Sequence, residues 1–178
     1  MSMTQALAPH LPYLRRYARA LTGAQKSGDA YVRASLQALL AGDQTLVADL
    51  PPRVALYKLF HTIWSSPASR FDQGSADMDA VDSPEGRLQS LSADRRAALL
   101  LTAVESFSLE EAAQILGESV EEVEHAIVDA QRSIEDELVS RILIIEDEPI
   151  IALDLENLVT ELGHEVVATA STKDQAVK

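Results

Sequence analysis

Residues 91–134 read LSADRRAALLLTAVESFSLEEAAQILGESVEEVEHAIVDAQRSI, and this stretch decides the fold of most of the chain. It contains two capping boxes, in which a serine and a later glutamate satisfy the first backbone N–H groups of a helix. The pairs are Ser108 with Glu111 and Ser119 with Glu122. Gly117 stands between them, where glycine readily ends a helix. Two helices joined by such a tight turn predict a helix-turn-helix.

The residues before this stretch predict three more helices and a linker. Apolar residues at helical spacing predict a first helix at residues 11–21, which stops at Gly23. A second helix is expected at about residues 29–40. A third is expected at residues 51–65, since proline suits a first helical turn. Residues 67–87 lose this periodicity and fill with Ser, Asp, Gly and Pro, which is typical of a linker.

The pattern changes class at Arg141. The segment RILII, residues 141–145, contains four consecutive apolar residues, as a strand buried on both faces would. A helical pattern follows at residues 149–162, and a second strand is expected at residues 164–171. This is the β-α-β start of a parallel sheet, and two strands cannot bury their faces alone. Either the chain is a fragment or something else covers the exposed edge.

The predicted fold class is therefore mainly α, a helical domain with a helix-turn-helix followed by an incomplete α/β segment. No cysteine is present, which excludes disulfides and thiolate chemistry. No run approaches the ~20 apolar residues that cross a membrane, and the N-terminus lacks a signal pattern, so we expect a cytoplasmic protein without a membrane partner. We find no nucleophile–base pair and no glycine-rich phosphate loop, so we do not expect an enzyme.

Charge is distributed unevenly along the chain. Residues 1–70 carry a net charge of +5, residues 71–140 one of −13 and residues 141–178 one of −5. Such asymmetry concerns partners rather than fold. The basic residues Arg15, Arg16, Arg19 and Arg33 form either a weak nucleic-acid patch or, in the favoured interpretation, a solvated face.

The second helix of the predicted helix-turn-helix has the wrong charge for DNA. Six acids accompany a lone Arg132, and they are Glu121, Glu122, Glu124, Asp129, Glu135 and Asp136. Affinity for DNA comes largely from cationic groups that neutralise phosphates. Acids in the first turn also favour the positive end of the helix dipole, but that does not restore DNA binding. We therefore expect no binding to DNA.

The helical part is similar to the extracytoplasmic-function class of bacterial sigma factors. Residues 11–65 resemble sigma region 2, and residues 88–138 resemble region 4, with the opening stretch as the more specific match. The string RILIIEDEPIIALDLENLVTELGHEVVATAS resembles the start of a response-regulator receiver. A sigma-like part followed by a receiver is the arrangement of the PhyR-type general stress response regulators of alphaproteobacteria. The resemblance implies a region 2-like module (1–66), a linker (67–87), a region 4-like module (88–138) and the N-terminal part of a truncated receiver (139–178).

This resemblance implies an anti-anti-sigma response regulator. Phosphorylation of the receiver would free the sigma mimic to sequester an anti-sigma factor of the NepR type, and the true sigma factor would be released for general stress response transcription. Phosphorylation need only bias two packings of the same domains. A histidine kinase or phosphotransfer partner would act on the full-length protein. The phosphoacceptor aspartate of such receivers lies beyond residue 178, so no catalytic residue is named, and we expect partner binding without phosphorylation.

The resemblance also suggests a cation site. Glu146 and Asp147 follow the first predicted strand, at the edge where ligands gather in open α/β sheets. Paired carboxylates suit Mg²⁺. In the family Asp147 would touch the metal and Glu146 would act mainly through water. We expect Mg²⁺ in the complete receiver and no functional site in this shorter chain.

Six residues are candidates for the partner surface, although the apolar ones are more often plain core residues. They are Leu21, Leu36, Glu121, Glu122, Val123 and Ile127. The acids could compete for a partner's basic groove, which adds association rate and specificity. The alternative function is an authentic DNA-binding sigma factor of the extracytoplasmic-function type, or a transcription regulator, with a receiver-like tail.

Overall fold

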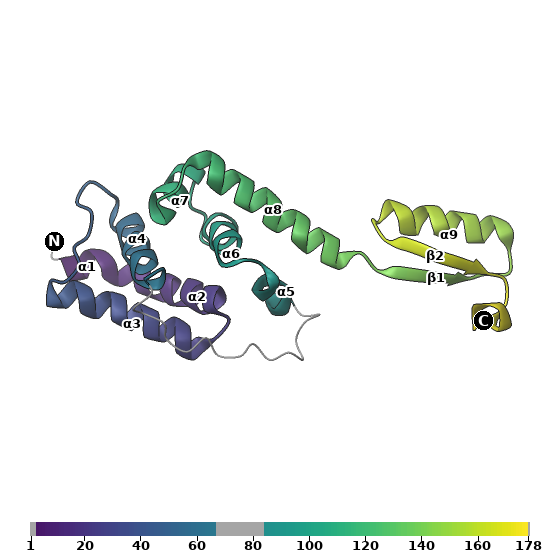
Figure 1. Ribbon diagram of the computed structural model, residues 1–178, viewed down its shortest axis with the longest axis horizontal. Coiled ribbons are helices and arrows are strands. Elements are labelled where there is room, and N and C mark those ends of the chain that lie inside the picture. Colours follow the sequence, from purple (N-terminus) through teal and green to yellow (C-terminus); the bar gives the residue numbers. More distant parts are fainter. Residues whose placement is uncertain (1–2, 67–83, 178) are drawn as a thin grey trace. The chain divides into compact units, whose positions relative to one another are not determined.

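The computed structural model describes residues 3–66 and 84–177. The chain consists of two compact units, Met1–Gln131 and Arg132–Lys178 (Figure 1). No helix in the described residues is both long and apolar enough to cross a bilayer. The predicted fold class is confirmed, because helices precede a small parallel β-α-β segment.

The first helices of the helical unit are α1 (Met3–Leu7), the 3₁₀ turn η1 (Ala8–His10), α2 (Leu11–Thr22), α3 (Gln25–Ala41) and α4 (Pro52–Trp64). Helix α2 ends as predicted at Gly23, whose φ of 71° is left-handed. The prediction for α3 was wrong at its start, because the helix begins at Gln25 rather than near Asp29.

The part of α3 that the prediction left out contains Gly28, which packs on α2. Gly28 lies against α2 so closely that an added Cβ would come within 2.7 Å of the backbone nitrogen of Arg19. A glycine inside a helix costs backbone entropy, but here it lets two helices approach (Figure 1). Sequence periodicity alone does not reveal such a contact.

The second group of helices holds the helix-turn-helix. It comprises α5 (Pro84–Ser90), α6 (Ala93–Leu99), the π-helical turn η4 (Leu100–Val104), α7 (Leu109–Leu116) and α8 (Val120–Leu138). The predicted linker at residues 67–87 lies outside the described residues up to residue 83, and α5 begins within its last part. The boundary between the two units falls inside α8.

One hydrophobic core joins both groups of helices. Its fully buried members include Tyr17, Tyr57 and Phe60 from the first group and Leu101 and Ile115 from the second. The centroid of the Phe107 ring lies 4.9 Å from that of the Tyr57 ring, in an edge-to-face arrangement that favours aromatic pairs. The two groups are therefore packed as one body and do not form separate cores.

The C-terminal unit contains the predicted β-α-β unit. Strand β1 (Arg141–Ile145) pairs in parallel with β2 (Glu165–Ala170), and the register shifts between Ile142 and Leu143. Helix α9 (Pro149–Glu161) connects the strands and packs on them, and the short α10 (Lys173–Ala176) follows β2 (Figure 1). Within the described residues the sheet has two strands.

Candidate protein-binding surface

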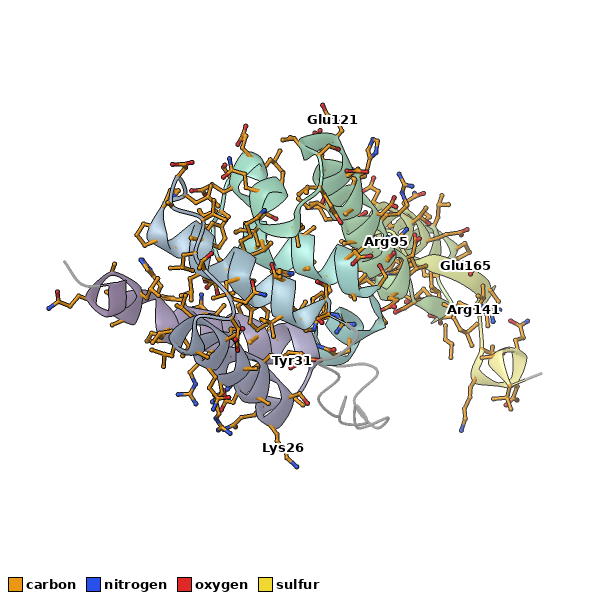
Figure 2. All side chains as sticks on the ribbon, turned by 60° about the vertical axis from the view of Figure 1, so that its left-hand side comes forward. Lys26, Tyr31, Arg95, Glu121, Arg141 and Glu165 are labelled. Carbon is orange, nitrogen blue, oxygen red and sulfur yellow. The ribbon has the colours of Figure 1, made fainter. Side chains whose placement is uncertain are left out.

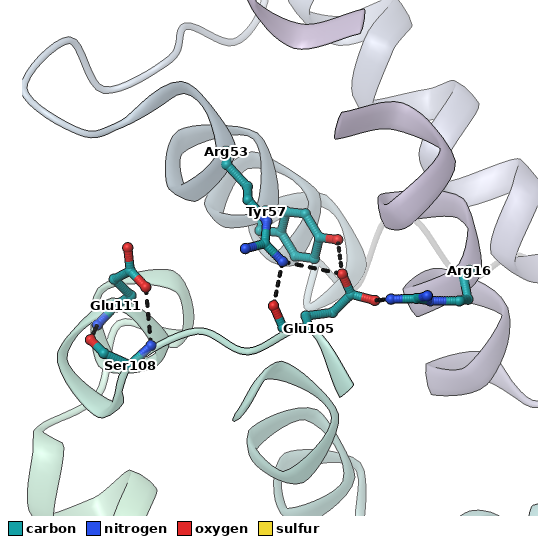
Figure 3. Close-up of polar contacts among 6 residues, drawn as sticks. All are labelled: Arg16, Arg53, Tyr57, Glu105, Ser108 and Glu111. Atoms are coloured by element: carbon teal, nitrogen blue, oxygen red, sulfur yellow. Dashed lines mark hydrogen bonds and ion pairs between the residues drawn. The ribbon is translucent and has the colours of Figure 1, made fainter. Parts of the chain in front are cut away.

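The helix-turn-helix is built as the sequence predicts. Ser108 Oγ accepts a hydrogen bond from Glu111 N at 3.2 Å, and Glu111 returns one by accepting from Ser108 N at 3.0 Å (Figure 3). Ser119 and Glu122 repeat the arrangement at the start of α8, at 3.2 and 2.7 Å. Gly117 ends α7 with a φ of 78°. Both predicted capping boxes are thus confirmed.

The start of α8 presents acids to solvent. Glu121, Glu122 and Glu124 are exposed, and Glu121 points away from the helical unit (Figure 2). Burial, together with the nearby charges of Asp94 and Glu122, raises the pKa of Glu118 just before the helix. Hydrogen bonds from Ser119 lower the pKa of Glu122, so this acid stays ionised in its cap. The face that would enter a DNA groove therefore has a negative potential.

Most of the predicted basic face is neutralised. Arg15 and Arg19 each donate two hydrogen bonds to the Asp29 carboxylate, with closest N–O distances of 2.9 and 2.8 Å. These two guanidinium groups hold the pKa of Asp29 well below its usual range. Arg16 pairs with Glu105 at 2.7 Å. Three of the four arginines singled out in the sequence thus serve the fold, which favours the solvated-face interpretation over a phosphate-binding patch.

A shallow groove of about 400 Å³ lies between α2 and α3. Val32, Leu36 and the 85% exposed Leu40 supply its apolar lining. Its polar lining comes from Arg15, Asp29, Arg33 and Gln37. An apolar floor beside charged side chains is the composition of a protein-binding surface.

The structure separates the six candidate partner residues into two groups. Leu21 and Val123 are 1% and 0% exposed, so both are core residues that present no surface to a partner. Leu36 and Ile127 are half-buried, and Glu121 and Glu122 are exposed. Leu36 lines the groove, whereas the other three lie on α8.

Sequence reasoning missed a buried carboxylate. The side chain of Glu105 has no exposed area, and it receives hydrogen bonds from Arg16, Arg53 and Tyr57 (Figure 3). Burial, followed by the hydrogen bond to Glu105, raises the pKa of the Tyr57 hydroxyl, which therefore donates. The signal in the sequence is slight: a single acid in the apolar run LLLTAVESF, with Arg53 and Tyr57 one helical turn apart.

The acidic pair of the C-terminal unit lies where the sequence predicts. Glu146 and Asp147 follow β1, and Glu146 Oε1 accepts a hydrogen bond from Glu148 N at 3.0 Å. Asp147 is exposed. Within the described residues, no group of three or more His, Cys, Asp or Glu side chains could hold a metal ion. Two carboxylates supply only part of the roughly six to eight oxygen ligands that a hard cation takes.

Comparison with known proteins gives matches along the whole chain. Residues 7–61 match the family described as the sigma2 domain of PhyR, and residues 88–137 match the sigma-like domain of the response regulator PhyR. The phyllosphere-induced regulator PhyR of Methylorubrum extorquens is 44% identical over 179 aligned residues, which cover 100% of this chain. The chain spans 66% of the length of that relative.

Two solved structures contain similar chains. One is the anti-anti-sigma factor PhyR complexed with the anti-sigma factor NepR from Bartonella quintana, with a TM-score of 0.75 and 38% identity over 99% of this chain and 67% of that one. The other is the NMR structure of the PhyRSL–NepR complex from Sphingomonas sp. Fr1, with a TM-score of 0.60 and 41% identity over 76% of this chain and 88% of that one.

Proposed function

The chain belongs to the PhyR family, and from that premise we propose that it is an anti-anti-sigma response regulator. Its sigma-like unit would mimic a sigma factor and sequester an anti-sigma factor of the NepR type. The true sigma factor would then be free for general stress response transcription. Two similar proteins were solved in complex with NepR, which supports this choice of partner.

One observation carries the proposal: a correctly built helix-turn-helix has the wrong charge for DNA. The caps and turn of α7 and α8 are complete, yet the first turn of α8 is acidic. A phosphate backbone would meet carboxylates where it needs cations. A protein partner with a basic surface would meet complementary charge instead. A sigma-factor mimic requires the shape of the helix-turn-helix without its affinity for DNA.

The partner surface that we propose combines this acidic face with the α2–α3 groove. Leu36 and Leu40 would accept apolar side chains of a partner helix. Glu121, Glu122 and Ile127 would contribute from α8. A stable interface buries about 1,600 Å² in total, which exceeds what the groove alone offers, so both surfaces are needed.

The C-terminal unit would carry the control. In a complete receiver Glu146 and Asp147 would help to hold Mg²⁺, and the ion would neutralise charge during phosphoryl transfer from a histidine kinase or phosphotransfer partner. The protein itself would regulate and not catalyse, in the cytoplasm. We propose the division into residues 1–66, 67–87, 88–138 and 139–178 for the region 2-like module, linker, region 4-like module and receiver part.

Calorimetric titration with a NepR-type anti-sigma factor, without a phosphodonor, tests the proposal. We expect one-to-one binding, weakened when Leu36→Ala and Leu40→Ala reduce the apolar lining of the groove. Leu153→Ala, an exposed leucine of α9, is the matched control. If the 178-residue chain does not bind, repeating the titration with residues 1–138 shows whether the C-terminal unit blocks the surface. Failure of both chains to bind would reject the proposal.

The alternative of a DNA-binding sigma factor makes the opposite prediction. A promoter gel shift with a salt titration should show no sequence-specific retention at physiological salt, because the acidic face repels phosphates. Specific retention there would revive the alternative.

A further inference from the structure

Glu105 connects the two groups of helices in the helical unit through its carboxylate. Arg16 of α2 donates to Oε1 through Nε and Nη2, at 3.2 and 2.7 Å. Tyr57 of α4 donates to Oε2 at 2.8 Å, and Arg53 of α4 reaches the same oxygen at 3.3 Å. Arg53 also donates to the main-chain oxygen of Glu105 (Figure 3). Every one of these donors comes from the region 2-like helices, while the acceptor follows η4.

The backbone around Glu105 is shaped to hold it there. The residue follows the π-helical turn η4, and Ser106 has a φ of 57°, the left-handed region that side chains other than glycine rarely adopt. Phe107 then enters the core, with the Arg53 guanidinium 4.0 Å from its ring centroid. π-helical turns and strained residues persist only where the surrounding contacts determine them.

Further polar contacts join the same two groups of helices. Arg96 donates to Leu21 O at 2.6 Å, and Gln89 donates to Ala20 O at 2.8 Å, so both satisfy carbonyl groups at the end of α2. Lys58 of α4 donates to Gln114 O of α7. Glu105 differs from these contacts because it is a buried charge, and removing a partner from a buried charge is far costlier than losing a surface bond.

We propose that Glu105 is a positioning residue that locks the region 4-like helices onto the region 2-like helices. Because it is buried, it cannot contact a partner itself. Its effect on binding, which rests on the proposed function, would come from preassembling a surface that includes α3 and α8. Preorganisation of this kind raises affinity by reducing the cost of ordering on binding.

The direct test measures the arrangement of the helices without any partner. The chain has no native cysteine, so spin labels at Lys26→Cys on α3 and Glu121→Cys on α8 report one distance; both side chains point outward (Figure 2). Double electron–electron resonance should give a single narrow distribution for the parent chain. Glu105→Gln, which keeps the shape and removes the charge, should broaden it. An unchanged distribution would overturn the inference.

A matched control separates this role from a general loss of ion pairs. Asp29→Asn removes a carboxylate that also binds two arginines, but all three residues belong to α2 and α3. It should therefore leave the distance distribution narrow. If Asp29→Asn broadens the distribution as much as Glu105→Gln does, the specific role of Glu105 is rejected. Should Glu105→Gln fail to fold, Arg16→Gln removes one donor whose side chain is 55% exposed.

Measuring the affinity for the anti-sigma factor then tests whether the locked arrangement matters for binding. If Glu105→Gln leaves only about a tenth of the molecules in the locked arrangement, affinity for the anti-sigma factor should fall about tenfold. Equal affinity despite a broadened distribution would overturn the positioning role. Failure of both the parent chain and residues 1–138 to bind would reject the proposed function alone, because the distance measurement decides independently whether Glu105 locks the helices.

Discussion

The helical unit and the C-terminal unit bury apolar side chains to very different extents. In the helical unit a single cluster closes around residues such as Leu14, Phe60 and Leu101, which have no exposed area. In the C-terminal unit Ile150, Leu158 and Leu162 are 71%, 52% and 65% exposed. Both units follow their sequence patterns, but only the first has enough elements to cover the apolar faces that those patterns create.

The difference shows that forming helices and strands does not by itself bury apolar side chains. A parallel strand is apolar on both faces, so it needs layers on each side. Strands β1 and β2 have α9 packed on them, yet Leu143, Ile145 and Val167 remain 40% to 54% exposed. Most of the stability should therefore lie in the helical unit, and matched substitutions in the two units can measure that.

The largest difference in the free energy of unfolding should come from substituting one leucine in each unit. Leu101→Ala removes a fully buried side chain, and we expect a loss of about 2–5 kcal/mol in the free energy of unfolding. Leu158→Ala removes a half-exposed one and should cost well under about 1 kcal/mol. Urea unfolding is followed by the fluorescence of Trp64, the single tryptophan, which reports on the helical unit, and by far-UV circular dichroism, which reports on both units. Similar shifts for both variants would refute the contrast.

The pH dependence of stability should also differ between the units. His61 is buried with its Nε2 2.6 Å from the Tyr17 hydroxyl, and burial lowers its pKa to about 3. The unfolded chain takes up this proton below about pH 6.5 while the folded chain does not, so stability falls as the pH falls from about 6.5.

From pH 6 to pH 4.5 the loss due to His61 should be about 2 kcal/mol, at roughly 1.4 kcal/mol per pH unit. His61→Gln should flatten this slope, as measured by urea midpoints at each pH. The control is His164→Gln in the C-terminal unit, which should leave the Trp64 transition and its slope unchanged. An unchanged slope in His61→Gln would mean that other groups cause the acid sensitivity.

Local signals in the sequence were sufficient for the turn of the helix-turn-helix and for the β-α-β order, because capping and glycine termination act within a few residues. Ser108, Glu111 and Gly117 illustrate this. The burial of Glu105 depends on contacts with residues far away in the chain, 89 positions in the case of Arg16, and the packing of Gly28 depends on the neighbouring helix α2. Leu21 and Val123 were ambiguous for the same reason, since an apolar residue at helical spacing fits a core and an interface equally well.

Glycines in the two units should respond differently to alanine. Gly28→Ala would place a Cβ 2.7 Å from the α2 backbone, and overpacking of this kind costs about 1–3 kcal/mol. Gly163 has a φ of 83°, and a Cβ added there would meet no other atom within 4 Å, so Gly163→Ala should cost about 1 kcal/mol through backbone strain alone. Only Gly28→Ala should shift the unfolding transition reported by Trp64. If Gly28→Ala leaves that transition unchanged, α2 and α3 can separate at little cost.

The smallest difference in stability between the units should come from substitutions at the helix caps. Ser108 caps α7 within the packed helical unit, and Ser108→Ala should cost about 1 kcal/mol because Glu111 N loses its acceptor. Thr172 caps α10 in the same way, but α10 has only four residues, none of them buried. Thr172→Ala should therefore change the far-UV circular dichroism slightly and leave the main unfolding midpoint in place. Ser108→Asp, which keeps an acceptor, should restore most of the loss. If it does not, the serine acts through packing and the cap is not the cause.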